Sequence, residues 1–198
     1  APAAPSSEPR LLAVADPDID SSSSNLPNCA RSLPALPGAR NESATLNALW
    51  HKRFGAKASA TVLSGANATE ARLRGDIAAA DIVHFGTHAI NLDENCAATD
   101  TMLASTRGFH FSADPTLDTA KPAIAPAALL LAPGPAAGSD DDGVLSAEEI
   151  AALDLSHTRW AVLAACATAA GETHRYEGQF GLARAFRMAG ARTVFTSL

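Results

Sequence analysis

The chain has 198 residues, of which 47% are hydrophobic, and this is enough for one globular domain with a substantial core. Its net charge is −6 and its basic residues are scattered, which argues against nucleic acid as a direct partner. No apolar run reaches the roughly 18 residues that a membrane-spanning helix needs, so no membrane partner is expected.

The N-terminal segment predicts a lead-in followed by a buried strand. Residues 1–10 are rich in Pro, Ala and Ser and are expected to form a disordered lead-in or linker, with the domain itself over 11–198. Leu11–Ala15 is apolar and is closed by Asp16-Pro17, which indicates a first strand. Residues 18–40 are dominated by Ser, Pro, Asn and Gly and predict a long surface loop.

Helical and strand patterns then alternate as far as residue 88. The predicted elements are a helix capped by Asn41 or Ser43 and ending near Phe54, a strand over 58–63, a helix capped by Thr69, and a strand over 81–88. The two helices are expected to bury Leu46, Leu49, Trp50, Leu73 and Ile77. Such alternation is typical of βαβ units and predicts an α/β fold with a mostly parallel sheet.

The second half of the chain repeats this alternation after a less regular stretch. In order, the patterns indicate a strand or hairpin arm over 102–111, a loop over 114–126, a short apolar segment over 127–132, a solvated acidic loop over 133–143, a helix capped by Ser146 and Glu149, a strand over 160–166, a helix over 176–189 and a last strand over 191–198. The helix over 176–189 is expected to bury one stripe and to stop at Gly190. That stripe consists of Phe180, Ala183, Phe186 and Ala189. Because the chain ends on a strand, we expect it to be truncated at its C-terminus relative to a longer domain.

Two of these strands end on residues with base and nucleophile chemistry. The strand over 81–88 ends on His88, and the strand over 160–166 ends on Cys166. The carboxyl ends of strands line the ligand crevice of an open α/β sheet, and an imidazole beside a thiol is what Cys–His acyl transfer requires. His84 competes with His88 because residues four apart in a strand share a face, but its place inside the apolar run favours the role of a hydrogen-bonded core histidine.

The cysteines and acidic residues do not indicate a metal or a cofactor. Cys29, Cys96 and Cys166 are widely separated, so free thiols in a reducing, cytoplasmic setting are the simplest interpretation, with a Cys29–Cys96 disulfide left open. No spacing typical of a metal site or of a nucleotide-binding loop is present. The acidic run at 140–142 lacks the ligand pattern of an EF-hand, since Gly138 takes the first ligand position.

Several motifs in order along the chain resemble the CHAT domain, a caspase-like family of cysteine peptidases that often accompanies TPR repeats. They are the opening strand over 11–17, Leu36-Pro37-Gly38-Ala39-Arg40-Asn41-Glu42, Ala68-Thr69-Glu70, Val83-His84-Phe85-Gly86-Thr87-His88-Ala89, residues 143–155, Cys166 with the strand before it, and residues 177–198. Each motif is weakly specific by itself, whereas their shared order is fairly specific.

The resemblance implies a caspase–haemoglobinase-like fold, a three-layer αβα sandwich around a parallel sheet. It implies His88 as the catalytic base and Cys166 as the nucleophile, with the backbone N–H groups of Ala89 and Cys166 forming the oxyanion hole. The family has glycine where this chain has Ala89, and alanine still supplies an N–H. The implied activity is a cysteine endopeptidase that cleaves a protein substrate, regulated by an attached or associated TPR or other sensor domain. The alternative is a catalytically weak or inactive CHAT module that acts as a protein-interaction domain.

Overall fold

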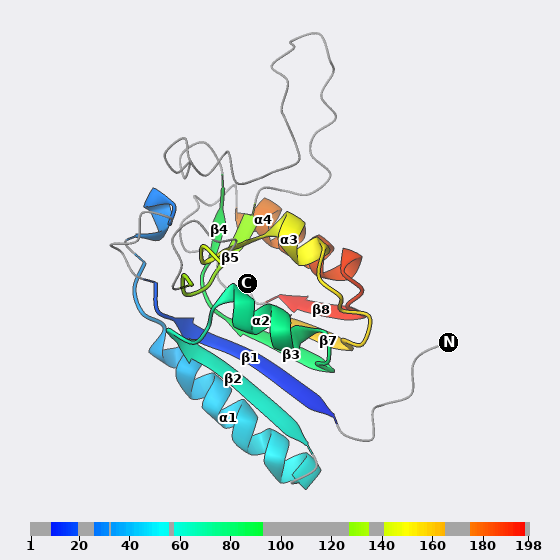
Figure 1. Ribbon diagram of the computed structural model, residues 1–198. Helices are drawn as coiled ribbons and strands as arrows, with labels where there is room; N and C mark the ends of the chain where they lie inside the picture. The colour runs from blue at the N-terminus through cyan, green and yellow to red at the C-terminus, as the bar shows by residue number, and fades with distance from the viewer. Residues whose placement is uncertain are drawn as a thin grey trace.

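The computed structural model describes residues 9–19, 26–31, 33–55, 58–92, 127–134, 141–164 and 175–196 (Figure 1). The strand or hairpin arm expected over 102–111 and the loop expected over 114–126 lie outside the described residues. The elements are β1 (Arg10–Pro17), a 3-10 turn η1 (Asn28–Ala30), α1 (Pro37–Phe54), β2 (Ser59–Gly65), α2 (Glu70–Ile77), β3 (Ile82–Gly86), β4 (Ala89–Asn91), β5 (Ala127–Leu130), β6 (Val144–Ser146), α3 (Ala147–Ala151), β7 (Trp160–Leu163), α4 (Arg175–Met188) and β8 (Thr193–Thr196).

A five-stranded sheet in the order β2-β1-β3-β7-β8 organises the fold, and every neighbouring pair in it is parallel. The side chains of α1 pack on one face of the sheet, whereas those of α2, α3 and α4 pack on the opposite face. This arrangement confirms the predicted α/β class with a mostly parallel sheet and helices on both sides. All five strands point the same way, so their carboxyl ends meet at one edge.

The helix α1 begins earlier than its sequence pattern predicts. It starts at Pro37, whose ring suits the first helical turn, so Asn41 and Ser43 lie inside the helix and do not cap it. Trp50 is buried as expected, but Leu49 is exposed because α1 touches the sheet along a narrower stripe than predicted. None of the helices in the described part of the chain is long and apolar enough to cross a membrane.

A second, antiparallel sheet in the order β4-β5-β6 was not predicted from the sequence. Its strands have only three or four residues each, too few for a clear alternation of apolar and polar side chains. Both faces of this sheet are covered. Ala89 and Leu129 belong to the main core, whereas Ile90 and Leu130 pack with Leu26 in a second cluster.

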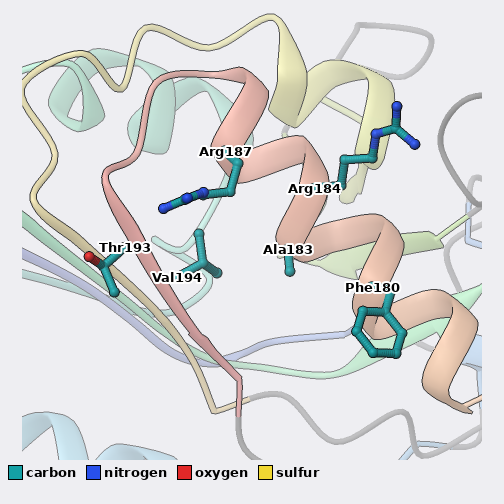
Figure 2. Close-up of a pocket in the computed structure, with 6 residues that line it drawn as sticks. All are labelled: Phe180, Ala183, Arg184, Arg187, Thr193 and Val194. Carbon is teal, nitrogen blue, oxygen red and sulfur yellow. The ribbon is translucent and has the colours of Figure 1, made fainter.

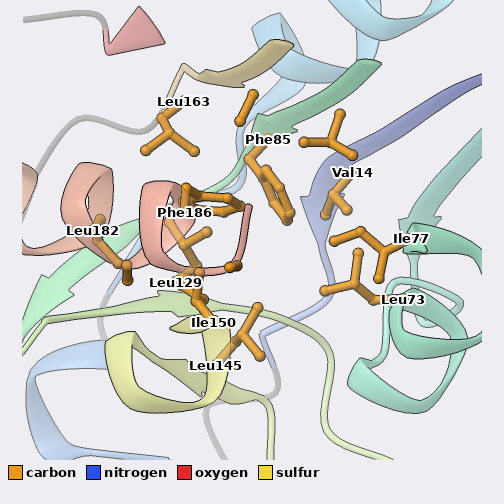
Figure 3. Close-up of a cluster of buried hydrophobic side chains, with 14 of the residues drawn as sticks. Val14, Leu73, Ile77, Phe85, Leu129, Leu145, Ile150, Leu163, Leu182 and Phe186 are labelled. Atoms are coloured by element: carbon orange, nitrogen blue, oxygen red, sulfur yellow. The ribbon is translucent and has the colours of Figure 1, made fainter. Parts of the chain in front are cut away.

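The main core lies between the parallel sheet and α2, α3 and α4 (Figure 3). At its centre the rings of Phe85 on β3 and Phe186 on α4 pack in a tilted arrangement with their centroids 5.3 Å apart. The later members of the predicted stripe of α4, Phe186 and Ala189, are buried as expected, whereas its first member is not. Phe186 is fully buried with Leu182, as Figure 3 shows, but Phe180 is 75% exposed.

Candidate functional site

The strand that leads to His88 lies directly beside the strand that leads to Cys166. In the register of β3 and β7, Phe85 pairs with Leu163, and the N–H of Ala164 donates to the carbonyl of Phe85 over 2.9 Å. Cys166 itself lies outside the described residues. Two peptide units separate it from Ala164, and they span at most about 7 Å.

His88 follows the end of β3 and is held by a backbone carbonyl. Its Nε2 lies 2.7 Å from the carbonyl oxygen of Pro34, and the side chain is only 2% exposed. A carbonyl can only accept, so Nε2 donates in this bond and Nδ1 carries the lone pair of the neutral ring. When the ring is neutral, the geometry therefore selects the tautomer in which Nδ1 is the basic nitrogen.

The carbonyl that orients His88 could not be identified from side-chain chemistry. Pro34 lies in the segment Leu33-Pro34-Ala35-Leu36-Pro37, directly before α1. Its two prolines fix their own φ angles and restrict the residues before them, which stiffens this segment. The close spacing of the prolines was therefore the one available signal that this part of the long loop has a fixed shape.

A close contact places this segment on the end of the β3 strand. A Cβ atom at Gly86 would lie 2.9 Å from the Cβ of Ala39, in the first turn of α1. Only glycine lets the helix approach the strand so closely at this position. The start of α1 and the segment before it therefore lie against the same strand end that carries His88.

Ala89, the expected oxyanion donor, is the first residue of β4. The N–H of Leu130 donates to the carbonyl of His88 over 2.9 Å, which makes His88 and Leu130 a hydrogen-bonded pair. Antiparallel pairs alternate, so the next pair, Ala89 and Leu129, does not exchange hydrogen bonds, and the Ala89 N–H points away from β5. Among the described residues, Asp16 is the one non-glycine with a positive φ, so alanine is unstrained at position 89.

His84 occupies a different environment from His88. It is buried on β3, and its Nε2 lies 3.3 Å from Glu42 Oε1 on α1, an ion-pair distance when the ring is protonated. Neither ring nitrogen has a hydrogen bond. Val83 and Phe85 point into the main core, so His84 points to the opposite face, beneath α1. The burial agrees with the expected core role, but the hydrogen bond expected of a core histidine is not formed.

The acidic loop expected to be solvated is partly built into the fold. Asp141 Oδ1 accepts the N–H of Glu70 over 2.8 Å at the start of α2, and Glu70 Oε1 accepts the N–H of Gly143 over 3.2 Å. Glu70 is buried, which raises its pKa to about 8, with further increases from Glu149 and Asp142 and an opposing effect from Arg74. Burial also raises the pKa of Asp142. The loop was predicted as solvent-exposed because its partners on α2 are about 70 residues away.

Cys29 corrects the expectation of free thiols, because it is disulfide-bonded. It packs against the second core cluster, which also contacts Leu92 at the end of β4. The chain's other cysteines, Cys96 and Cys166, both lie outside the described residues.

Figure 2 shows an open groove between α4 and β8, lined by Phe180, Ala183, Arg184, Arg187, Thr193 and Val194. Of the candidate residues that the structure describes, neither His88 nor Ala89 lines this groove. Within the described ranges, no group of three or more His, Cys, Asp or Glu side chains is arranged to hold a metal ion.

The family model of the CHAT domain matches residues 1–198, the whole chain. Among curated proteins, none matches this sequence.

Proposed function

Because the chain belongs to the CHAT domain family, a caspase-like peptidase family, we propose that it is a cysteine endopeptidase that cleaves a protein substrate by Cys–His acyl transfer. The observation that carries the proposal is the bond from His88 Nε2 to the Pro34 carbonyl. It gives the imidazole a fixed orientation through Nε2, at the strand end next to the one that leads to Cys166.

In the proposed reaction, His88 takes the proton of the Cys166 thiol and the sulfur attacks the carbonyl carbon of a substrate peptide bond. The C–N bond breaks, and the imidazolium of His88 returns the proton to the leaving amine. Water, deprotonated by the same imidazole, then hydrolyses the thioester and releases the carboxylic acid and the free thiol. The N–H groups of Ala89 and Cys166 are the proposed donors to the oxyanion.

One observation favours a second function, a CHAT module that is weakly active or inactive and serves as a protein-interaction domain. His88 is 2% exposed, so a substrate cannot reach its ring from solvent without movement of the residues around it. A buried base of this kind is compatible with a domain that has kept the family's core but binds a protein without cleaving it.

Alkylation of Cys166 by iodoacetamide across pH separates the two functions. A thiolate paired with imidazolium reacts near neutral pH, whereas an ordinary thiol reacts near its pKa of about 8.5. For the peptidase we expect the rate at pH 7 to fall roughly tenfold in His88→Ala. His84→Ala is the matched control, because it removes a buried imidazole from the same strand, and its rate should stay close to wild type. A slow reaction that is independent of His88 would contradict the peptidase and favour the interaction module.

We also propose that a TPR or other sensor domain, attached or associated, controls access to the site. This proposal follows from the family resemblance. The cytoplasmic location stays a prediction, and the disulfide at Cys29 weighs against it because stable disulfides are rare in reducing compartments. The same alkylation assay, carried out with and without a co-purified TPR or other sensor domain, tests whether another domain changes the reactivity of Cys166.

A further inference from the structure

Asp16 has an unusual backbone conformation at the end of β1. Its φ is 46°, in the left-handed region that aspartate tolerates better than most residues but that still costs free energy. Its carboxylate is buried, which requires compensating hydrogen bonds. Strained residues of this kind persist where the surrounding structure holds them, and they concentrate near functional sites.

The Asp16 carboxylate binds the segment that orients His88. Its Oδ1 accepts the backbone N–H of Leu36 over 2.6 Å, and its Oδ2 lies 2.6 Å from Nε of Arg40 on α1. Leu36 is the residue that precedes the first turn of α1 and lies two positions after Pro34. A carboxylate at the amino end of a helix is also favoured by the helix dipole.

A continuous set of contacts therefore joins the end of β1 to the imidazole. Asp16 fixes Leu36, the two prolines of the segment stiffen the chain between Leu36 and Pro34, and the Pro34 carbonyl accepts the His88 Nε2–H. Each link is short and buried or half-buried, and no long flexible side chain intervenes.

We propose that Asp16 is a positioning residue for His88. It holds the Pro34 carbonyl where it selects the Nε2–H tautomer and so keeps Nδ1 as the basic nitrogen. The catalytic consequence of this role rests on the proposed peptidase function, whereas the effect on the tautomer does not. Asp16 acts through the backbone and touches neither the thiol nor the substrate in this scheme.

Two substitutions separate the hydrogen bond from the backbone strain. Asn and Gly both tolerate a positive φ, but only Asn keeps an acceptor oxygen for the Leu36 N–H. Asp16→Asn should therefore behave like wild type, and Asp16→Gly should release the segment. Asp18→Asn is the matched control, because the exposed Asp18 carboxylate also approaches Arg40, at 3.5 Å, without the bond to Leu36.

The tautomer is read from long-range ¹H–¹⁵N correlation spectra of protein labelled with [¹⁵N]histidine, recorded at alkaline pH and assigned with His88→Gln. We expect a single Nε2–H form in wild type, Asp16→Asn and Asp18→Asn, and a mixture of tautomers in Asp16→Gly. An Nδ1–H form in wild type would overturn the proposal. This measurement needs no variant of Asp16, so the proposal can be tested even if Asp16→Gly does not fold. An unchanged tautomer in a folded Asp16→Gly would overturn it as well.

Alkylation of Cys166 at pH 7 then measures the chemical consequence. Misplacement of a catalytic group by about 1 Å can cost a hundredfold, so we expect at least a roughly tenfold loss of rate in Asp16→Gly and recovery in Asp16→Asn. If the His88 tautomer depends on Asp16 but the reactivity of Cys166 does not depend on His88, the result would support the positioning role and contradict the peptidase. If instead the reactivity of Cys166 depends on His88 but the His88 tautomer is unchanged in Asp16→Gly, the result would support the peptidase and contradict the positioning role.

Discussion

Substitution of Glu70 by glutamine should stabilise the protein at neutral pH. Glu70 is the first residue of α2 and is 1% exposed. Burial, with Glu149 and Asp142 nearby, raises its pKa from 4.5 to about 8, so the folded protein holds this carboxyl protonated at pH 7. In the unfolded chain the same carboxyl is ionised. Folding at pH 7 must therefore take up a proton.

The cost of this proton uptake follows from the two pKa values. Below pH 4.5 the carboxyl is protonated in both states and costs nothing. Between pH 4.5 and about 8 the folded state binds more protons than the unfolded state, so the free energy of unfolding falls as pH rises, and above pH 8 the loss is complete. At about 1.4 kcal/mol per pH unit, the loss from pH 4.5 to pH 7 is about 3 kcal/mol.

The glutamine side chain has nearly the same shape as the neutral carboxyl group of Glu70, but it does not titrate. Its amide oxygen can accept only one of the two N–H groups that Glu70 now accepts, from Gly143 at 3.2 Å and from Arg74 at 3.0 Å. Arg74 keeps its ion pair with Glu149 at 2.9 Å. Urea unfolding between pH 5 and 9 should show a weaker loss of stability in Glu70→Gln than in wild type, with the variant more stable at pH 7 by at most about 3 kcal/mol, because glutamine loses one of the two hydrogen bonds that Glu70 accepts. Exposed Glu148 gives the control, since Glu148→Gln should leave the pH dependence unchanged. A Glu70→Gln variant with the same pH slope as wild type would refute the reasoning.

Three further outcomes test the core, the strand end and the cysteines. Phe186→Ala should lower the free energy of unfolding by about 3–5 kcal/mol in urea titrations, whereas exposed Phe180→Ala should change it by less than about 0.5 kcal/mol. Equal effects would contradict the observed face of α4. Gly86→Ala should cost about 1–3 kcal/mol, because the added methyl meets Ala39, and an unchanged melting temperature would show that the close approach is not required. Peptide mapping should find Cys29 protected from iodoacetamide until a dithiol reductant is added, and direct modification without reductant would contradict the disulfide.

Local chemistry made part of the fold predictable from the sequence. Thr69 and Ser146 both cap helices as predicted, because a capping side chain bonds to an N–H only three residues away. Gly190 likewise adopts the positive φ, 111°, expected at a helix end. The strand that leads to His88 follows from its apolar composition, although it ends at Gly86 and His88 lies two residues further on.

The remaining features depend on contacts between distant segments, which a single sequence does not encode locally. The pattern Asp16-Pro17 indicated only a strand end, whereas the roles of Asp16 depend on Leu36 and Arg40, 20 and 24 residues away. The acceptor for His88 is a backbone carbonyl, and every residue has one, so no residue type marks it. The predicted stripe of α4 took every third residue, which drifts around a helix of 3.6 residues per turn. Phe180 and Ala189 therefore lie on opposite sides of α4, and only the later members of the stripe are buried.

The candidate site combines an oriented base with restricted access, and both properties come from the same packing. The segment before α1 fixes the ring of His88 because it lies against the end of β3, and the same close contact contributes to its burial. Alignment of the base therefore needs no ligand, whereas contact with a substrate requires movement. If the chain is a peptidase, its control should act on access to His88, so an activating partner should raise the rate of Cys166 alkylation without changing the His88 tautomer. An activator that changes the tautomer would instead act through Asp16 and the Pro34 carbonyl.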